Sequence, residues 1–272
     1  PGELVEYLAE LHAANVERNW MLREALEEIV AWFGVAGIEV MLLKGAAVLA
    51  DDLYGDPGAR LMGDLDLLVS QEQAEAAQKL LLAQGYALCP STEEKIVYRL
   101  PTDAGYHHDP LHRPDTGIVI EIHFKVMSRQ SGRALPVERV WQERVTAPGF
   151  PDHVYLPSPG WRFLHNALHA LLPYGEFINA RIPLGDLAEA AALLVAIPEM
   201  DSRCWQDAID RHCLREELDG YALLLRELMD VSLPATLEPQ TRRALVELLV
   251  AGGARELQPV DSPMTARLRR HY

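Results

Sequence analysis

Met62–Val69 reads MGDLDLLV, two aspartates that alternate with aliphatic residues directly after a glycine-containing loop. In a β-strand, side chains at positions i and i+2 point to the same face. Asp64 and Asp66 are therefore predicted to share one face, and Leu65 and Leu67 the other. Two neighbouring carboxylates repel each other unless a cation or a proton lies between them, and oxygen ligands of this kind suit Mg²⁺. Taken alone, the pair is equally consistent with two solvated acids at a strand edge.

The sequence before this stretch predicts a strand, a glycine turn and a helix. Residues 38–43 form a mostly apolar run, IEVMLL, which is typical of a buried strand. Residues 44–50, KGAAVLA, have helix composition and open on a lysine and a glycine. A strand, turn and helix in this order direct backbone N–H groups and a helix dipole at an anion. Residues 54–60, rich in glycine and proline, are predicted to form the loop that leads into the aspartate strand.

A third carboxylate follows on a later strand. Residues 118–126 include VIEIHF at 119–124, in which Glu121 and His123 alternate with apolar residues and so share one face of a strand. The two aspartates, the Lys44–Gly45 turn and Glu121 all lie on strands or at strand ends, where a sheet can bring them together.

The composition bounds the class of protein. The chain has 272 residues, 49% of them hydrophobic and 24% charged, enough for one large domain or two small ones. A net charge of −15 argues against a broad nucleic-acid surface, because contacts to phosphates are the main source of such affinity. It allows a nucleotide whose phosphates a metal neutralises. No run reaches the roughly 18 apolar residues of a membrane span.

A cytoplasmic protein is expected. The first residues lack the basic start and apolar core of a signal peptide. The three cysteines have no tight C-x-x-C spacing, which favours reduced thiols.

Hydrophobic periodicity predicts an α+β arrangement followed by helices. Further helices are expected at 4–33 and 71–84, and further strands at 86–88, 96–100, 106–112 and 118–126. After about residue 130 strand signals fade, and helices are expected at 136–144, 159–172, 183–196, 201–211, 214–230 and 240–251. We therefore expect a small mixed β-sheet with flanking helices over residues 1–147 and an all-helical domain over 148–272, with prolines between 148 and 159 marking the passage.

The motifs resemble a known family. LLKGA at 42–46, LYGDPGARLMGDLDLLV at 53–69 and EIHF at 121–124 are similar to the bacterial uncharacterised nucleotidyltransferases of the DNA polymerase β-like superfamily. The resemblance is good over residues 38–127. It continues weakly into FLHNALH at 163–169 and LGDLA at 184–188.

The resemblance implies a set of roles. Asp64 and Asp66 would hold two Mg²⁺ ions on an NTP, and Glu121 would be the third carboxylate, binding the second metal or activating the acceptor. The reaction would move an NMP from the NTP to a hydroxyl or amine of a small molecule, peptide or protein and release pyrophosphate. Lys44, Gly45, Arg60, Gly63 and His123 would line the nucleotide side of the site. A membrane or a nucleic acid is not expected as a partner.

The turn departs from the wider superfamily, in which a small hydroxyl residue commonly follows the glycine. Here Ala46 follows Gly45, and the spacing from Gly45 to Asp64 is longer than usual. Lys44 and Arg60 could supply the charge to phosphate instead, although Lys44 could simply cap the strand and Arg60 could pair with Asp56. These departures keep open a non-catalytic nucleotide-binding or regulatory module, or a toxin- or antitoxin-like protein, with the same fold.

The histidines pose a separate question. His107, His108, His112 and His123 lie close together in the sequence, but their spacing gives little support to a zinc site. His165 and His169 share one helix face and belong either to a helix interior or to a substrate cleft. Asp186, at the start of the next predicted helix, is either a partner of the helix dipole or a cleft residue. No G-x-S-x-G, Walker or dinucleotide-binding glycine pattern occurs.

Overall fold

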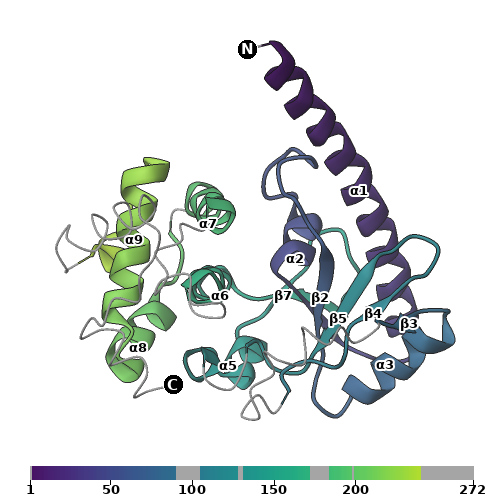
Figure 1. Ribbon diagram of the computed structural model, residues 1–272. Helices are drawn as coiled ribbons and strands as arrows, with labels where there is room; N and C mark the ends of the chain where they lie inside the picture. Colours follow the sequence, from purple (N-terminus) through teal and green to yellow (C-terminus); the bar gives the residue numbers. More distant parts are fainter. Residues whose placement is uncertain (1, 90–104, 128–130, 172–183, 198, 240–272) are drawn as a thin grey trace, which may run out of the picture. The chain divides into compact units, whose positions relative to one another are not determined.

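The computed structural model describes residues 2–89, 105–127, 131–171, 184–197 and 199–239 (Figure 1). The chain divides into two compact units. The first unit comprises residues up to 129 together with 136–158, and the second comprises 130–135 and the residues from 159 onward.

A seven-stranded mixed sheet forms the centre of the first unit. Its strands are β1 (Val40–Leu43), β2 (Asp64–Leu68), β3 (Ala87–Leu88), β4 (Leu111–His112), β5 (Val119–His123), β6 (Val145–Thr146) and β7 (Val154–Leu156). They lie in the order β3-β4-β5-β2-β1-β7-β6. The β2–β5 and β1–β7 pairs are parallel, and the other neighbours are antiparallel. The sheet agrees with the predicted mixed β-sheet with flanking helices.

The core of the first unit lies on one face of this sheet. Leu65 and Leu67 of β2 and Ile120 and Ile122 of β5 belong to a single buried cluster with side chains of the helices α1 (Gly2–Val35), α2 (Lys44–Asp51) and α3 (Ala74–Ala83). Because side chains alternate along a strand, Asp64, Asp66, Glu121 and His123 point to the opposite face. The alternation predicted from the sequence is therefore present in the structure.

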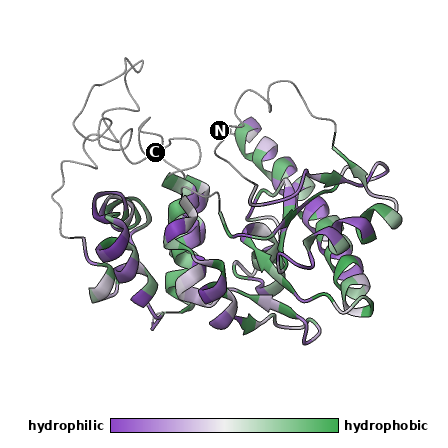
Figure 2. Cartoon of the chain, turned by 90° about the horizontal axis from the view of Figure 1, so that it is seen from below, coloured by the Kyte–Doolittle hydropathy of each residue, from purple (hydrophilic) through white to green (hydrophobic). Residues whose placement is uncertain are grey.

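Helix α1 is buried only in its C-terminal part. Leu22, Leu26, Ile29 and Phe33 are fully buried, whereas Leu4, Leu8 and Leu11, which belong to the same apolar periodicity, are exposed by about half or more. Figure 1 shows the N-terminal turns of α1 extending beyond the sheet. In Figure 2, hydrophobic and hydrophilic residues alternate along the helix that starts at the N label. Periodicity predicted the helix correctly but not which of its turns the sheet covers.

The β6–β7 hairpin was not predicted. Both strands are very short, and residues between them and just after them include Pro148, Pro151 and Pro157, which suggest a linker. Strand β7 nevertheless pairs in parallel with β1, between β1 and the edge strand β6. The division expected after residue 147 falls between these two strands, and the division itself stays a prediction.

The strand predicted over residues 106–112 is interrupted. His107 forms an isolated bridge to His123, and a regular strand appears only at Leu111–His112. Pro110 has no N–H to donate to a ladder, which explains the break. The strand predicted at 96–100 and the helix predicted at 240–251 lie outside the described residues.

The described part of the second unit is built of helices. They are η1 (Ser131–Ala134), α6 (Pro159–Leu171), α7 (Leu184–Ala196), α8 (Arg203–His212), α9 (Arg215–Met229) and η2 (Ala235–Leu237). Trp161, Phe163, Trp205 and Tyr221 are almost completely buried, and the rings of Phe163 and Trp205 lie 5.2 Å apart. These helices occur close to the positions that periodicity predicts. A further short helix, α5 (Val137–Gln142), belongs to the first unit.

None of the helices in the described residues combines the length and apolar character needed to cross a membrane.

Candidate active site

The pairing of β2 with β5 sets the frame of the candidate site. The two strands run in parallel with Asp66 opposite Glu121 and Leu68 opposite His123. Residues in register on adjacent strands have their Cβ atoms on the same face, about 5 Å apart. The structure therefore brings together two of the three predicted carboxylates, although the residues lie far apart in the sequence.

Asp66 is the centre of the cluster. Its carboxylate is buried, with 2% of the residue exposed. Atom Oδ1 accepts a hydrogen bond from Lys44 Nζ at 2.8 Å and lies 2.9 Å from His123 Nε2. His123 is completely buried and also lies 3.4 Å from Glu121 Oε2. A buried carboxylate needs such partners, since burial without them is strongly unfavourable.

The interactions shift the pKa values of these groups in opposite directions. Burial favours the neutral form of Asp66, but the charge of Lys44 and the hydrogen bond from His123 outweigh it and hold the pKa of Asp66 well below its ordinary value. Burial opposes the charged form of His123, yet Asp66 and Glu121 raise its pKa. Lys44 likewise has a raised pKa, because Asp66 outweighs the effect of burial. The cluster is thus held as a charged network.

Asp64 behaves differently, although it lies on the same face of β2. Burial and the negative charges of Asp66 and Glu121 raise its pKa to about 6, and Lys44 and His123 offset this only in part. The pKa of Glu121 is lowered: burial raises it, but the hydrogen bond from His123 prevails. Asp64 is therefore the carboxyl group for which the site lacks a positive partner.

The residues of the site include donors that suit a divalent cation. One potential ligand atom from each of Asp66, Glu121 and His123 lies within 4.8 Å of the others. The sequence predicted Asp64 rather than His123 as the third ligand beside Asp66 and Glu121. The unbalanced negative charge at Asp64 is a second feature that a bound cation would relieve. Carboxylate oxygens match the preference of Mg²⁺, whereas a histidine nitrogen suits a transition metal better.

Lys44 and Gly45, which the sequence predicts as a turn between strand and helix, are the first two residues of α2 and follow β1 directly. Lys44 has a φ of 47°, a left-handed conformation that is uncommon for a residue with a side chain and that occurs at functional sites. Gly45 is buried, and a Cβ atom there would lie 2.6 Å from Met62 Sδ. A larger residue at position 45 would therefore force the buried Met62 side chain to move.

The loop that contains Arg60 and Gly63 is held by helix α1, which sequence reasoning missed. Asn15, Arg18 and Asn19 donate side-chain hydrogen bonds to loop carbonyl oxygens, and His12 pairs with Asp56 at 3.0 Å. Asp56, considered above as a partner of Arg60, thus has a partner on α1. One signal was available: asparagines at i and i+4 are unfavourable inside a helix unless they have specific partners.

His107 also adjoins the site. Its ring centroid lies 5.2 Å from that of His123, and its Nδ1 lies 2.6 Å from the carbonyl oxygen of His108. Burial lowers its pKa, so the ring is neutral at pH 7. The antiparallel bridge of His107 to His123 is a long-range contact that periodicity does not reveal.

The other histidines do not join the cluster. In the described part of the chain, none of them forms a further group of three potential ligands with other histidines, cysteines or acids. His165 and His169 lie on α6 in the second unit, with ring centroids 6.2 Å apart, and His165 is buried. Tyr221 of α9 donates to Asn166 Oδ1 and to the carbonyl oxygen of Asp186.

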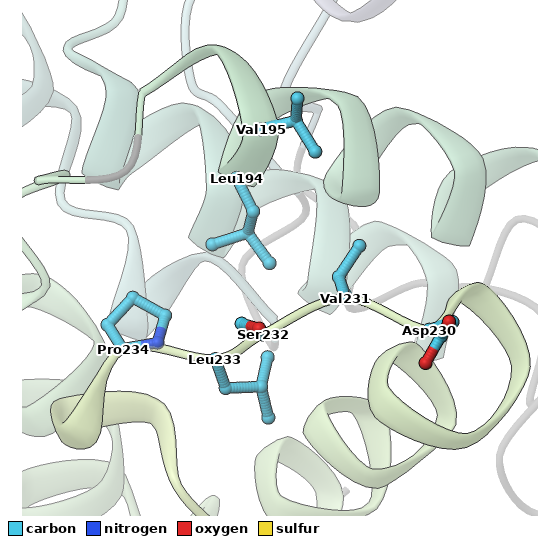
Figure 3. A pocket seen from close by; sticks show the side chains of 7 residues that line it. All are labelled: Leu194, Val195, Asp230, Val231, Ser232, Leu233 and Pro234. Carbon is cyan, nitrogen blue, oxygen red and sulfur yellow. The ribbon is translucent and has the colours of Figure 1, made fainter.

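A pocket of about 430 Å³ lies in the second unit, between the end of α7 and residues 230–234 (Figure 3). Its lining is mainly aliphatic, and it comprises Leu194, Val195, Asp230, Val231, Ser232, Leu233 and Pro234. One carboxylate among aliphatic side chains lacks the convergent charges found around Asp66.

The sequence was compared with known protein families and with curated proteins. A family model described as "Uncharacterised nucleotidyltransferase" matches residues 1–230, which include the first unit, the second unit as far as residue 230 and every residue of the candidate site. No curated protein matches the chain.

Proposed function

The chain belongs to the family of uncharacterised nucleotidyltransferases, and from that premise we propose that it transfers an NMP from an NTP to a hydroxyl or amine acceptor with the help of Mg²⁺. The acceptor would be a small molecule, a peptide or a protein. The single observation that carries the proposal is the convergence of Asp66, Glu121 and His123 beside Lys44 on one face of β2 and β5.

In the proposed reaction, the acceptor oxygen or nitrogen forms a bond to the α-phosphorus. The bond from that phosphorus to the oxygen bridging to the β-phosphate breaks, and pyrophosphate leaves. Bound Mg²⁺ would neutralise the phosphates and steady the attacking and leaving oxygens. Asp64, Asp66 and Glu121 would hold the metal.

The chain's own residues would support this step in distinct ways. Burial raises the pKa of Glu121, but the hydrogen bond from His123 outweighs it, and as a carboxylate Glu121 would bind the second metal or accept the acceptor's proton. His123 lies between Asp66 and Glu121 and fixes both carboxylates. Lys44 carries a full positive charge beside the cluster and would contact the phosphates. Gly45, Arg60 and Gly63 would line the nucleotide side.

Nucleotide binding with and without Mg²⁺ tests the proposal. Wild-type protein should bind at least one of the four NTPs in an Mg²⁺-dependent manner. Asp64→Asn and Glu121→Gln should weaken that binding by at least about tenfold, since each removes a negative charge from the cluster. Glu75→Gln is the matched control, because Glu75 pairs with Lys79 at the exposed surface of α3. Absence of Mg²⁺-dependent binding to every NTP would refute the proposal.

One observation favours a second candidate, a nucleotide-binding module without turnover. The charge of Asp66 is already balanced by Lys44 at 2.8 Å and by His123. Such a protein would bind a nucleotide but release no pyrophosphate with any acceptor. A pyrophosphate assay over a broad panel of hydroxyl and amine acceptors separates the two candidates.

A further inference from the structure

Helix α1 presents a row of polar side chains to the loop that precedes β2. Asn15, Arg18 and Asn19 are spaced at i, i+3 and i+4, so they lie on one side of the helix. Asn15 and Asn19 are buried, with 8% and 2% exposed. Buried amides in the interior of a helix are costly unless their hydrogen-bonding groups are used.

The two asparagines donate hydrogen bonds to main-chain carbonyl oxygens of the loop. Asn15 Nδ2 donates to the carbonyl oxygens of Gly58 at 2.7 Å and Arg60 at 2.8 Å. Asn19 Nδ2 donates to those of Pro57 at 2.6 Å and, again, Arg60 at 2.8 Å. The Arg60 carbonyl thus receives two hydrogen bonds, which uses both of its lone pairs.

Arg18 holds the last two residues before β2. Its Nε donates to the Met62 carbonyl at 2.7 Å and its Nη2 to the Gly63 carbonyl at 2.8 Å. Asp64, the first residue of β2, follows directly. A peptide unit is planar and leaves two soft dihedral angles per residue, so fixing the Gly63 carbonyl restricts where the backbone of Asp64 can lie.

The same loop also packs against the Lys44–Gly45 turn. Met62 Sδ lies 2.6 Å and Arg60 Nε 3.5 Å from the position that a Cβ of Gly45 would occupy. A displacement of the loop would therefore disturb both the turn and the start of β2. Nucleotidyl transfer depends chiefly on position, and errors near 1 Å can cost about a hundredfold in rate.

We propose that Asn15, Arg18 and Asn19 are positioning residues, which hold the Pro57–Gly63 loop so that Asp64 and the Lys44–Gly45 turn meet the metal-bound nucleotide. The inference rests on the proposed function. It adds to that function the role of α1, which lies outside the catalytic cluster and from which Asn15, Arg18 and Asn19 bind the loop through its main-chain oxygens.

Arg18→Gln is the most direct test. Arg18 is half-buried, and glutamine keeps the helix propensity while it removes the paired charged donors. Arg18→Lys should recover only part of the effect, because a single ammonium is poorly shaped to bridge two successive carbonyls. Arg23→Gln is the matched control: Arg23 lies on the same helix but donates to the Leu49 carbonyl and pairs with Glu27.

Two measurements keep the inference separate from the proposed function. Hydrogen exchange, followed by mass spectrometry, reports how firmly residues 57–64 are held, and titration with Mg²⁺ and a non-hydrolysable ATP analogue, or the NTP analogue that wild type prefers, reports nucleotide affinity. We expect Arg18→Gln to speed exchange in this segment and to weaken nucleotide binding by about tenfold or more. Arg18→Lys should be intermediate and Arg23→Gln should resemble wild type in both. Thermal unfolding of each variant verifies that the protein is folded.

The other outcomes are distinguishable. Faster exchange with unchanged nucleotide affinity in Arg18→Gln would overturn the positioning role while leaving the proposed function intact. Unchanged exchange in Arg18→Gln would likewise overturn it, and so would an equal effect of Arg23→Gln. If wild-type protein binds no nucleotide at all, the proposed function fails and the positioning role falls with it. Asn15→Ala is a second variant, expected to speed exchange around Gly58 and Arg60 in particular.

Discussion

Asp66 Oδ1 is a single buried acceptor on which Lys44 Nζ and His123 Nε2 converge. An ion pair in this position does not need to add net stability, because desolvation offsets much of the attraction. Removing one partner is a different matter, since the remaining charge is then buried alone. The strength of the cluster is therefore best measured by comparing single with double substitutions.

Asp66→Asn should destabilise the protein by about 3–5 kcal/mol, because it leaves the charges of Lys44 and His123 without their nearest counter-charge. Lys44→Met should also destabilise it. The double variant Asp66→Asn/Lys44→Met should lose less than the sum of the two single losses. Urea unfolding at pH 7 measures all three free energies, and strict additivity would contradict the coupling.

Asp64 gives a prediction about pH. Its folded-state pKa is about 6 against an ordinary value of 3.8, so between about pH 4 and about pH 6 the folded state binds more protons than the unfolded state. Stability must then fall as the pH rises through this window. Asp64→Asn removes the effect and should stabilise the protein by up to about 3 kcal/mol at pH 7, with little change near pH 4. Urea unfolding of both proteins at the two pH values measures this difference, and a constant difference would contradict the shifted pKa.

At the level of elements, the sequence does not predict the contact between the Lys44–Gly45 turn and the Pro57–Gly63 loop. The glycine at position 45 was assigned to anion binding, yet the structure gives it a packing role against Met62. Gly63, which was grouped with it, has no atom within 4 Å of the place where a Cβ would lie. The two glycines therefore differ in what they tolerate.

Gly45→Ala should destabilise the protein by about 1–3 kcal/mol, because the new methyl group collides with the Met62 side chain. Met62→Ala makes room, so the double variant should cost less than the sum of its parts. Gly63→Ala is the control and should stay within about 0.5 kcal/mol of wild type. Thermal unfolding of the four variants measures their stability. An equal loss of stability in Gly45→Ala and Gly63→Ala would contradict the packing role.

Across the whole molecule, local patterns predicted what depends on local physics. Alternation correctly predicted that Asp64 and Asp66 share one face of β2 and that Glu121 and His123 share one face of β5, because the side-chain period of a strand is fixed by its backbone. Periodicity likewise located most helices. The convergence of the strands was inferred from the family resemblance rather than from the residues.

The remainder depends on contacts between distant segments. Three contacts are of this kind: the pairing of β7 with β1, the bridge between His107 and His123, and the hydrogen bonds from Asn15 and Arg18 to the loop. Each joins residues that are far apart in the sequence or lie in short irregular segments. Such contacts leave little trace in composition or period. The group of potential ligands also includes His123, which the sequence did not predict as a ligand, because strand alternation gives the face of a residue but not the reach of its side chain. Asp64 as a metal ligand stays a prediction.

Because the chain has a net charge of −15, two effects of salt on its stability must be distinguished: screening of the repulsion between acids and specific binding of a metal ion. Repulsion among the excess acids destabilises the compact state, so NaCl should raise the midpoint of thermal unfolding by screening it. MgCl₂ at the same ionic strength should raise it further if the site binds the ion: an ion at ten times its Kd adds about 1.4 kcal/mol, or roughly 3–5 °C for a chain of this size. Glu121→Gln should lose this excess and keep the response to NaCl, whereas Glu75→Gln should keep both. An equal midpoint in the two salts for wild type would contradict a specific Mg²⁺ site in the nucleotide-free protein.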